Sequence, residues 1–351
     1  MSVGQAGGAA GEPLEAEVQR QLRSTFGPAV LEAEGGSTGL YALLGQVGLL
    51  ERRCRNPVLV AGAGSAGAKL ALAQALGKLD TVGLDLVAQC VNDVLARGAL
   101  PLFFLAHLAA TEAEASAVAL PIVKGIAKGC RQADCALLGS SVERPAGPAA
   151  PGECHLTGFA VGMVERARLL EGPAAARPGD LVLGLTAGGL PAGAVERARR
   201  LLVDTGGLRL DEQPPELACP LGEELLRPAR IYVRAVRAVL ERYRVKGVVH
   251  GLAPVAEGGL VGSVAGVLGR RCVARLERAA LPRVPLLDLV QRVGGVADDE
   301  MGRTFPMGVG MAAIVAPFYA TAAIRRIRRA GERAAVIGEV VAGSGPAIVL
   351  A

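Results

Sequence analysis

The stretch from residue 80 to residue 110 constrains the fold most, because it predicts a helix that leads directly into a buried strand. In the helical part, apolar side chains recur with helical spacing and form one stripe, made of Leu86, Val87, Cys90, Val91, Val94 and Leu95. Gly98 is placed to end the helix, and Pro101 follows as a stop. The apolar run that begins at Pro101 then predicts a strand buried on both faces.

The polar residues of this predicted helix share another face, which holds Asp85, Gln89, Asn92 and Asp93. Two carboxylates and two amides on one face suit a site for a metal ion and phosphates. The alternative is a solvated helix face with no ligand, and the pattern alone favours that alternative.

Composition favours an α/β protein of two domains. The 351 residues suffice for two domains of ordinary size, and 51% of them are hydrophobic. Glycine is abundant (48 residues) and aromatic residues are few (3%), which indicates many tight turns. The net charge is +5, and the arginines look scattered along the sequence. Because few aromatic side chains could stack on bases, we expect no nucleic-acid partner.

Cysteine usage and hydropathy indicate a cytoplasmic protein. The seven cysteines are an odd number without a C-x-x-C pair, which argues against a zinc site and against a disulfide scaffold. The N-terminus shows no signal peptide, and no uncharged apolar run reaches the roughly 18 residues that a membrane span requires. We therefore expect no association with a membrane.

A glycine-rich segment follows a short predicted strand at residues 57–61. Gly62, Gly64 and Gly67 fit the pattern G-x-G-x-x-G ahead of a helical segment, which is the fingerprint of dinucleotide binding. Asp80 or Asp85 would supply the acidic residue of that motif. The segment is not a Walker A loop, because Lys69 does not directly follow Gly67. One interpretation of the chain is thus a dinucleotide-binding enzyme.

Further elements follow from periodicity and from turn residues. The predicted helices cover residues 14–22, 112–132 with a kink or break at Pro121, 193–202 and 231–243. The predicted strands cover residues 135–139, 179–186, 245–250 with His250 at the end, 312–315 and 335–340. Residues 1–12 and the Pro/Ala/Gly run at 145–151 are predicted to be irregular, and residues 40–50 form an apolar segment interrupted by glycine.

Two long motifs carry a family resemblance. The run Asp80-Thr-Val-Gly-Leu-Asp-Leu-Val-Ala-Gln-Cys-Val-Asn-Asp, with the Pro-Leu-Phe-Phe-Leu that follows, resembles the phosphoribosylformylglycinamidine cyclo-ligase (AIR synthetase) family. Glu300-Met-Gly-Arg-Thr-Phe-Pro-Met-Gly-Val-Gly-Met is the second match. The resemblance covers about residues 30–342 and is strongest to the animal form, where the enzyme is one domain of a longer trifunctional purine-synthesis polypeptide.

The resemblance implies an α/β (α+β) protein with a two-domain AIR-synthetase-like fold, in which helices pack on mixed sheets. It implies a disordered or partly helical segment at 1–30, an N-terminal domain at 31–170 with the ATP site and the dimer contact, and a C-terminal domain at 171–351. The implied activity is ATP-dependent ring closure of formylglycinamidine ribonucleotide to aminoimidazole ribonucleotide in purine biosynthesis. The implied cofactors are ATP and Mg²⁺, and the implied assembly is a homodimer.

The resemblance also implies roles for individual residues. Lys69, Asp93 and His250 are the candidate catalytic residues, and Asp85 and Asp93 are the candidate metal ligands. The candidate contacts to nucleotide or phosphate are Gly62, Gly64, Gly67, Asn92, Gly188, Gly189, Gly258 and Gly259. For His250, the alternative is that it only caps a strand.

Several polar positions of the family pattern are replaced in this chain. The Asp of the glycine-rich loop is Gly64, and the two Thr are Ala63 and Ala68, so Lys69 is expected to lack an anionic partner. The Glu after the strand at 135–139 is Ser141. The apolar framework thus survives better than the polar lining. This difference favours a second interpretation, a cyclo-ligase-like binding or assembly module with impaired catalysis. In the first interpretation, Glu143 or Glu257 would replace the missing acids.

Overall fold

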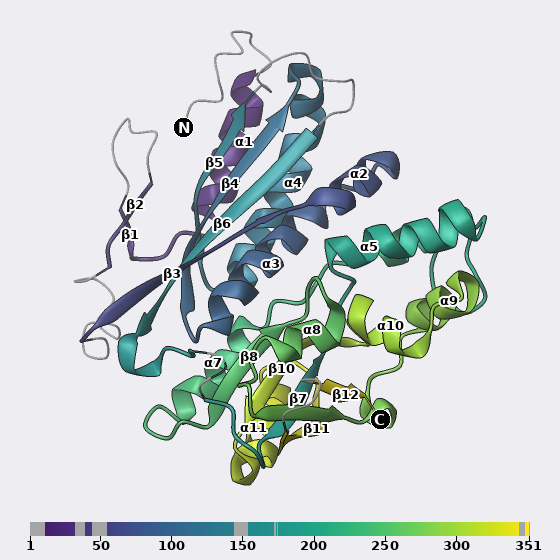
Figure 1. Cartoon of the computed structure of the whole chain (residues 1–351). Helices are drawn as coiled ribbons and strands as arrows, with labels where there is room; N and C mark the ends of the chain where they lie inside the picture. Colours follow the sequence, from purple (N-terminus) through teal and green to yellow (C-terminus); the bar gives the residue numbers. More distant parts are fainter. Residues whose placement is uncertain are drawn as a thin grey trace. The chain divides into compact units, whose positions relative to one another are not determined.

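The chain forms two compact units in a computed structural model that describes residues 11–31, 39–43, 55–143, 154–171, 173, 175–343 and 348–350. The first unit comprises Met1–Val94 and Ala99–Ala167, and the second comprises Leu95–Gly98 and Arg168–Ala351. Figure 1 shows the elements of both units in sequence colours. Among the described residues, no helix combines the length and the apolar character needed to cross a membrane.

The first unit alternates helices and strands. Its helices are α1 (Gly11–Arg23), α2 (Gly67–Ala75), α3 (Val82–Ala96) and α4 (Glu112–Gln132), with a 3-10 turn η1 (Arg166–Arg168) at the border of the units. Its strands are β1 (Val30–Leu31), β2 (Leu40–Tyr41), β3 (Pro57–Ser65), β4 (Leu100–Ala110), β5 (Ala136–Glu143) and β6 (Cys154–Glu165).

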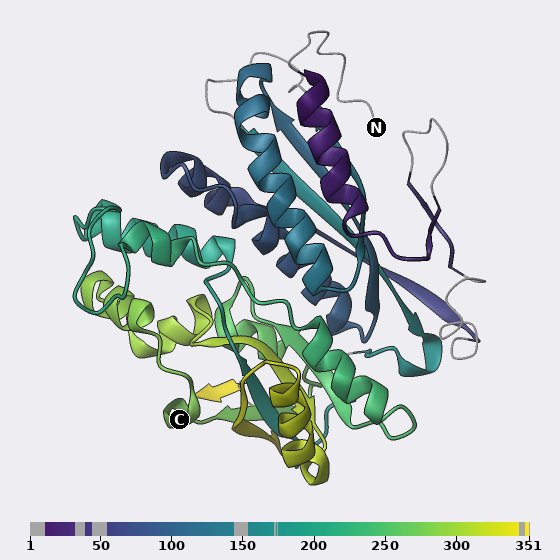
Figure 2. The ribbon, with the colours of Figure 1, turned by 180° about the vertical axis from the view of Figure 1, so that it is seen from behind.

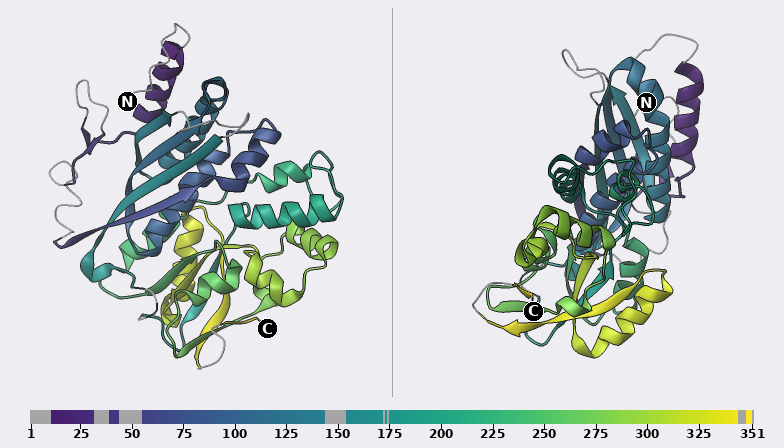
Figure 3. Two further views of the ribbon diagram at one scale, coloured as in Figure 1. Left: turned by 45° about the horizontal axis from the view of Figure 1, so that its top comes forward. Right: turned by 90° about the vertical axis from the view of Figure 1, so that its right-hand side faces the viewer.

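Four of these strands form a mixed sheet in the order β3-β6-β4-β5, in which only β4 and β5 are parallel. Side chains alternate between the faces: in β4, Phe104, Ala106 and Leu108 are buried, whereas the residues between them are partly exposed. The buried face is covered by α3 and α4, and α1 packs on α4 (Figures 1 and 3). The opposite face carries exposed Leu59, Leu105 and Phe159.

The central helix α3 fits closely between the sheet and α4 because small residues face it. A Cβ atom on Gly158 would lie 3.0 Å from Leu86, and one on Gly129 of α4 would lie 2.8 Å from Val87. Leu86 and Val87 are almost fully buried, as the predicted apolar stripe required. The helix ends at Ala96, and Gly98 takes a positive φ of 77°, so the predicted stop is confirmed.

Two details of the first unit differ from the sequence expectation. Strand β3 continues beyond residue 61 to Ser65, because each residue up to Ser65 pairs with β6, where Ser65 faces Thr157. Helix α4 is continuous through Pro121, so the predicted division is wrong, whereas the alternative of a kink stays a prediction. A single proline removes one backbone hydrogen bond, and packing of Ile122 and Ile126 in the core holds the helix together.

The second unit contains the larger sheet. Its helices are α5 (Ala192–Arg199), the π-helical η2 (Arg200–Thr205), α6 (Leu221–Leu225), α7 (Val233–Arg242), α8 (Gly259–Ala265), α9 (Pro285–Gly294), α10 (Asp298–Thr304) and α11 (Ala320–Arg329), with 3-10 turns η3 (Arg278–Ala280) and η4 (Pro317–Tyr319). Its strands are β7 (Leu181–Thr186), β8 (Val249–Pro254), β9 (Cys272–Leu276), β10 (Val309–Val315), β11 (Ala334–Ala342) and β12 (Ile348–Leu350).

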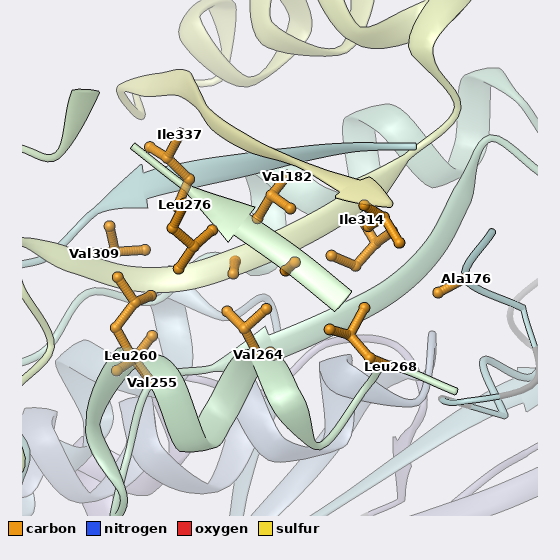
Figure 4. Packing of buried hydrophobic residues seen from close by; sticks show 14 of the residues in the cluster. Ala176, Val182, Val255, Leu260, Val264, Leu268, Leu276, Val309, Ile314 and Ile337 are labelled. Carbon is orange, nitrogen blue, oxygen red and sulfur yellow. The ribbon is translucent and has the colours of Figure 1, made fainter. Parts of the chain in front are cut away.

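The six strands follow the order β12-β9-β11-β7-β10-β8, and only the β12–β9 pair is parallel. One face packs on α8, whose Leu260 and Val264 share a buried cluster with strand residues such as Val182 and Ile314 (Figure 4). Leu268, just beyond the end of α8, belongs to the same cluster. Helices α7 and α11 pack side by side on the other face, which Figure 2 shows from behind. Both faces of this sheet are therefore covered, unlike those of the first sheet.

Strand β8 corrects the prediction for residues 245–250. The strand runs from Val249 to Pro254, so His250 lies at its beginning and not at its end. Four residues of strand, or ~13 Å, separate His250 from Pro254. The predicted helices and strands elsewhere in the second unit are present within a few residues, as for β7 and α7.

Mixed sheets packed by helices in two units confirm the predicted fold class. Residues 1–10 and 144–153 lie outside the described part of the chain, and so does most of the apolar segment at 40–50.

Candidate functional site

A buried ion pair in the first unit joins two predicted site residues. Lys69 Nζ in α2 lies 2.6 Å from Asp85 Oδ1 in α3, and the Lys69 side chain is only 1% exposed. The expectation that Lys69 lacks an anionic partner is therefore wrong. A buried ammonium needs such a partner, because transfer of an unpaired charge from water into the protein is strongly unfavourable.

The polar face of α3 divides into a buried and an exposed part. Asp85 and Asn92 are buried, whereas Gln89 and Asp93 are exposed. The interpretation as a solvated face is thus wrong for Asp85 and Asn92. It describes only Gln89 and Asp93, which lie at the surface.

Asp93 has a perturbed carboxyl group. Although part of its side chain reaches solvent, protein atoms around it displace water that would hydrate the carboxylate, and this desolvation raises the pKa of Asp93 to about 6. Burial, followed by the nearby charge of Asp93, raises the pKa of the Cys90 thiol to about 12. Asp93 can therefore bind or release a proton close to neutral pH, while Cys90 stays protonated.

The described residues offer no preformed carboxylate cage for a metal ion. No group of three or more His, Cys, Asp or Glu side chains in the described ranges could hold one. Asp85 and Asp93 are eight residues apart in one helix, which places their Cα atoms ~12 Å apart along the axis. The two carboxylates therefore cannot bind a single ion together, and Asp85 already binds the Lys69 ammonium.

The three glycines of the G-x-G-x-x-G pattern do not form one loop, because they belong to two secondary-structure elements. Gly62 and Gly64 lie within β3, which is antiparallel to β6, and only Gly67 begins α2 with a positive φ of 46°. A dinucleotide-binding turn instead joins a parallel strand to a helix. The local geometry differs from that of such a turn.

Gly62 and Gly64 allow β3 to pass close to α3. A Cβ atom on Gly62 would lie 2.9 Å from the Cys90 carbonyl oxygen and 3.4 Å from Asp93 Cβ. A Cβ atom on Gly64 would lie 2.8 Å from the Gln89 side chain. The structure thus brings Gly62 together with Asp93, and Gly64 together with Gln89.

Glu143 lies on the face of the first sheet that points away from α3, and so away from Asp93. Ser141 Oγ lies 2.9 Å from His107 Nδ1, and His107 belongs to the face that also carries exposed Leu105. Glu143 follows Ser141 by two residues in β5 and so shares that face, opposite α3. This placement makes Glu143 a poor replacement for an acid near Asp93.

The glycines of the second unit are also in tight contacts. Gly189 N–H donates to the Pro228 carbonyl at 2.8 Å, so that amide is already used. A Cβ atom on Gly188 would lie 2.5 Å from the same carbonyl oxygen. Gly258 and Gly259 have positive φ values of 86° and 62° and lead into α8.

Glu257 lies beside the first turn of α5. A Cβ atom on Gly193 would lie 3.6 Å from a Glu257 carboxylate oxygen. Glu257 precedes the pair Gly258–Gly259, so it combines an exposed carboxylate with a glycine turn. Its predicted role as a replacement acid stays a prediction.

His250 is held at the start of β8 by partners in its own unit. Its Nδ1 lies 2.7 Å from Asp180 Oδ2, and its Nε2 lies 2.9 Å from the Gly247 carbonyl oxygen. Asp180 is 4% exposed and also accepts a hydrogen bond from Arg177 N–H. Because both ring nitrogens are engaged, the geometry favours the structural alternative for His250.

The sequence did not reveal the surroundings of three polar residues, Asp180, Gln89 and Thr81. Asp180 follows a predicted strand boundary with no local sign of its partner, 70 positions away. Gln89 was assigned to the polar face, but not to the space beside Gly64. The buried Thr81 Oγ1 has no hydrogen-bond partner among the described residues, one turn before Asp85. Its position in the motif at 80–93 was the signal available.

Comparison with known proteins gives matches in both units. Residues 54–164 match the family model for AIR synthase related protein, N-terminal domain, and residues 177–351 match the model for its C-terminal domain. A phosphoribosylformylglycinamidine cyclo-ligase of Sorangium cellulosum is 43% identical over 95% of this chain and 92% of its own length. One from Symbiobacterium thermophilum is 44% identical over 96% and 93%.

Solved structures share the fold at low sequence identity. Thiamine-monophosphate kinase from Stenotrophomonas maltophilia has a TM-score of 0.64 and 20% identity, with 98% of this chain and 96% of that chain covered. The hydrogenase maturation protein HypE of E. coli has a TM-score of 0.63 and 19% identity, with 97% and 93% covered. These likenesses support the two-domain fold.

Proposed function

The chain belongs to the family of AIR synthase related proteins, and we propose that it is a phosphoribosylformylglycinamidine cyclo-ligase of purine biosynthesis. The observation that carries this proposal is the match to curated cyclo-ligases, at 43% identity over 95% of this chain for the Sorangium cellulosum protein. Identity of this extent covers both units, so it includes every element that positions the candidate site.

The proposed reaction joins an amidine nitrogen to the formyl carbon of the substrate. ATP transfers its γ-phosphoryl group to the formyl oxygen, the nitrogen forms a C–N bond with that carbon, and the oxygen leaves as phosphate. The products are aminoimidazole ribonucleotide, ADP, phosphate and a proton. Reactions of this type depend on positioning and on groups that stabilise or accept charge.

Asp93 is the best candidate for a proton acceptor in this reaction. A carboxyl group with a pKa of about 6 is mostly ionised at neutral pH, yet it binds a proton more readily than an ordinary aspartate. Asp93 also lies beside Gly62, where the absence of a side chain leaves the backbone of β3 close to it. We assign Asp93 the role of general base.

Lys69 has a positioning role in this proposal. Its ammonium is 2.6 Å from Asp85 and nearly inaccessible to solvent, so it cannot contact a substrate phosphate without leaving the carboxylate. The ion pair instead ties the beginning of α2 to α3 and thereby fixes the segment around Gly67. Asn92 is also buried on α3, and its predicted contact to nucleotide or phosphate stays a prediction.

ATP and Mg²⁺ are proposed cofactors, and the carboxylates of the described residues do not form a metal site by themselves. The described residues contain no cluster of three metal-binding side chains. Mg²⁺ usually keeps several waters and is bound by one or two carboxylates plus the phosphates of its substrate. The residues therefore suit at most a metal ion that arrives bound to ATP, and we derive no step through it.

We also propose that two copies of the chain associate through the open face of the first sheet. Leu59, Leu105 and Phe159 are 56%, 38% and 46% exposed on this face. Burial of such side chains against a second copy would stabilise a dimer. In light scattering after size exclusion, Phe159→Glu should convert a dimer to a monomer, whereas Phe318→Glu, at an exposed position of the second unit, should not. A monomeric parent protein would contradict this.

A second candidate function is the binding or assembly module with impaired catalysis. The observation that favours it is the environment of Gly64, where the family's acidic side chain is replaced by contact with Gln89. Under this alternative the protein binds nucleotide and does not turn over substrate. A cytoplasmic location stays a prediction under both candidates.

Calorimetry and a turnover assay separate the candidates. Titration with Mg²⁺–ATP measures binding, and product formation from formylglycinamidine ribonucleotide measures catalysis. Binding with turnover supports the cyclo-ligase, and binding without turnover supports the impaired module. Absence of both contradicts the cyclo-ligase and favours an assembly scaffold that does not bind nucleotide. The dinucleotide interpretation requires that NAD raise the melting temperature, which we do not expect.

A further inference from the structure

The second unit gathers positive charge on the surface formed by α7 and α11. Residues 230–246 contain six basic side chains and one acidic side chain, and residues 316–333 contain five basic side chains and one acidic side chain. These two segments thus carry a net charge of +9, whereas the whole chain carries +5. The rest of the chain is therefore net negative, and the arginines that look scattered in the sequence are concentrated by the packing of α7 on α11.

Aromatic side chains lie at one end of this basic surface. The Tyr243 and Tyr319 rings are 5.2 Å apart, and the Phe318 ring is 5.0 Å from Tyr319. Phe318 is 87% exposed, and Val245 in the neighbouring turn is 98% exposed. Exposure of this extent is costly to hydrate for apolar side chains, and it leaves the Phe318 ring accessible for stacking.

Cations surround these rings. Arg242 and Arg326 each lie 6.0 Å from the centre of the Tyr243 ring, and Lys246 lies 5.7 Å from that of Tyr319. The two carboxylates of the surface are already paired, Glu241 with Arg237 and Glu332 with Arg230. Glu241 also lies 3.7 Å from Arg244. Arg242 and Arg326 form no ion pair among the described residues, so their charge is available to an external anion.

Helix α11 extends the positive charge away from the rings. Arg325, Arg328 and Arg329 are exposed, and none has a carboxylate within 4.0 Å in the part of the chain that the structure describes. Arg325 and Arg329 lie four residues apart in the helix, so this row spans ~6 Å along its axis. Ten of the eleven basic side chains on the surface are arginines, whose planar groups bind phosphates with two hydrogen bonds.

We propose that the surface of α7, η4 and α11 binds a single-stranded nucleic acid, with phosphates on the α11 arginines and a base on Phe318. A basic surface with exposed aromatic rings at its end combines the two features that bind single strands without sequence preference. A duplex would satisfy the arginines but leave Phe318 unused. The scarcity of aromatic residues that argues against nucleic acid for the whole chain does not apply locally, since three of its ten Phe and Tyr residues lie here.

Fluorescence anisotropy with the full chain tests this proposal. The probes are labelled oligouridine and oligo-dT of about 20 nucleotides, a duplex of the same length, and anionic phospholipid vesicles by sedimentation. We expect both single strands to bind, with affinity that falls steeply between roughly 50 and 200 mM salt. Tighter binding of one strand then distinguishes RNA from DNA as the ligand.

Two sets of variants assign the contacts. Arg325→Gln with Arg329→Gln should weaken binding at least about 10-fold and reduce the slope of log affinity against log salt by about 1.4, the value for two phosphate contacts. The control, Arg209→Gln with Arg283→Gln, removes the same charge from exposed positions elsewhere in the second unit and should leave binding nearly unchanged. Melting temperatures confirm folding of each variant.

Phe318→Ala should weaken binding roughly 5- to 100-fold, the range for one stacked base, and Phe318→Tyr should restore it. Ring closure should be unaffected in all these variants, so failure here leaves the proposed cyclo-ligase function intact. The proposal is overturned by absence of single-strand binding at low salt, by equal affinity for the duplex, by an equal loss in the control pair, or by Phe318-dependent binding of vesicles in place of nucleic acid.

Discussion

Two polar contacts engage predicted site residues within their own units, and they do so in different ways. In the first unit, Lys69 and Asp85 come from adjacent helices only 16 positions apart, and Lys69 is 1% exposed. In the second unit, His250 and Asp180 are 70 positions apart, and the histidine also binds a backbone carbonyl. The first pair neutralises two full charges, whereas the second fixes a turn through a network of hydrogen bonds.

The comparison teaches that a polar residue inside a family motif can serve the fold without contacting a ligand. Lys69 and His250 were both candidates for catalysis, yet each has its polar atoms engaged within its own unit. Asp93, in contrast, is an exposed residue of α3. Of the three candidate catalytic residues, Asp93 is therefore the one best placed to contact substrate.

Lys69→Met tests the first pair and should have the largest effect. The substitution leaves Asp85 buried without its cation, which destabilises a protein by about 3–5 kcal/mol. Urea unfolding measures this loss. The double variant Lys69→Met with Asp85→Leu should recover most of it, because no unpaired charge remains. A single variant as stable as the parent would show that the pair does not hold α2 on α3.

Asp93→Asn separates the general base from the two positioning residues. Loss of a group that acts on the reacting atoms typically lowers kcat by about 10²–10³. We expect that decrease with a folded protein, measured by steady-state ring closure. Asp299→Asn, at an exposed position of α10, is the control and should retain full activity. Equal rates for the two variants would remove Asp93 from the reaction.

His250→Phe tests the second pair and should affect stability more than chemistry. Removal of a hydrogen bond to a charged group costs about 2 kcal/mol, so the melting temperature should fall. The melting temperature of Asp180→Asn should fall by a similar amount, because this substitution weakens the same contact. The value of kcat should stay near that of the parent. A large drop in kcat with unchanged stability would return His250 to the catalytic residues.

The pH dependence of stability gives the smallest effect. Desolvation raises the pKa of Asp93 from 3.8 to about 6, so the folded protein holds a proton there that the unfolded chain releases. This contribution to stability is present below about pH 4, falls as the pH rises to about 6, and is constant above that. Thermal melts of parent and Asp93→Asn should diverge over this interval, and parallel profiles would show that the carboxyl is not desolvated.

Local patterns in the sequence suffice for the elements with strong periodicity. Helices α3 and α4 follow from apolar stripes and from the stops at Gly98 and Pro101. The extension of β3 to Ser65 could not be predicted from such local patterns, because small residues have a weak preference for strands. Pairing with β6 imposes the strand there. The start of β8 was missed for a similar reason, since polar His250 is stabilised inside the strand by Asp180.

The candidate site was predictable in its residue types and not in its contacts. The motif at 80–93 identified Asp85, Asn92 and Asp93, but their different burial depends on α2 and on the sheet. Partner choice in ion pairs depends on the tertiary fold, which one sequence does not reveal. The structure shows Lys69 paired with Asp85, and on that basis we propose a supporting role for Lys69.

The most direct test measures formation of aminoimidazole ribonucleotide from formylglycinamidine ribonucleotide by the purified full chain with Mg²⁺–ATP, beside the Sorangium cellulosum cyclo-ligase. We expect product only when ATP is present, at a rate roughly 10²–10³ below that relative, since polar groups of the family pattern are missing. No product from a protein that binds ATP would contradict the proposed activity, and a rate equal to the relative's would contradict the role given to the lost polar groups.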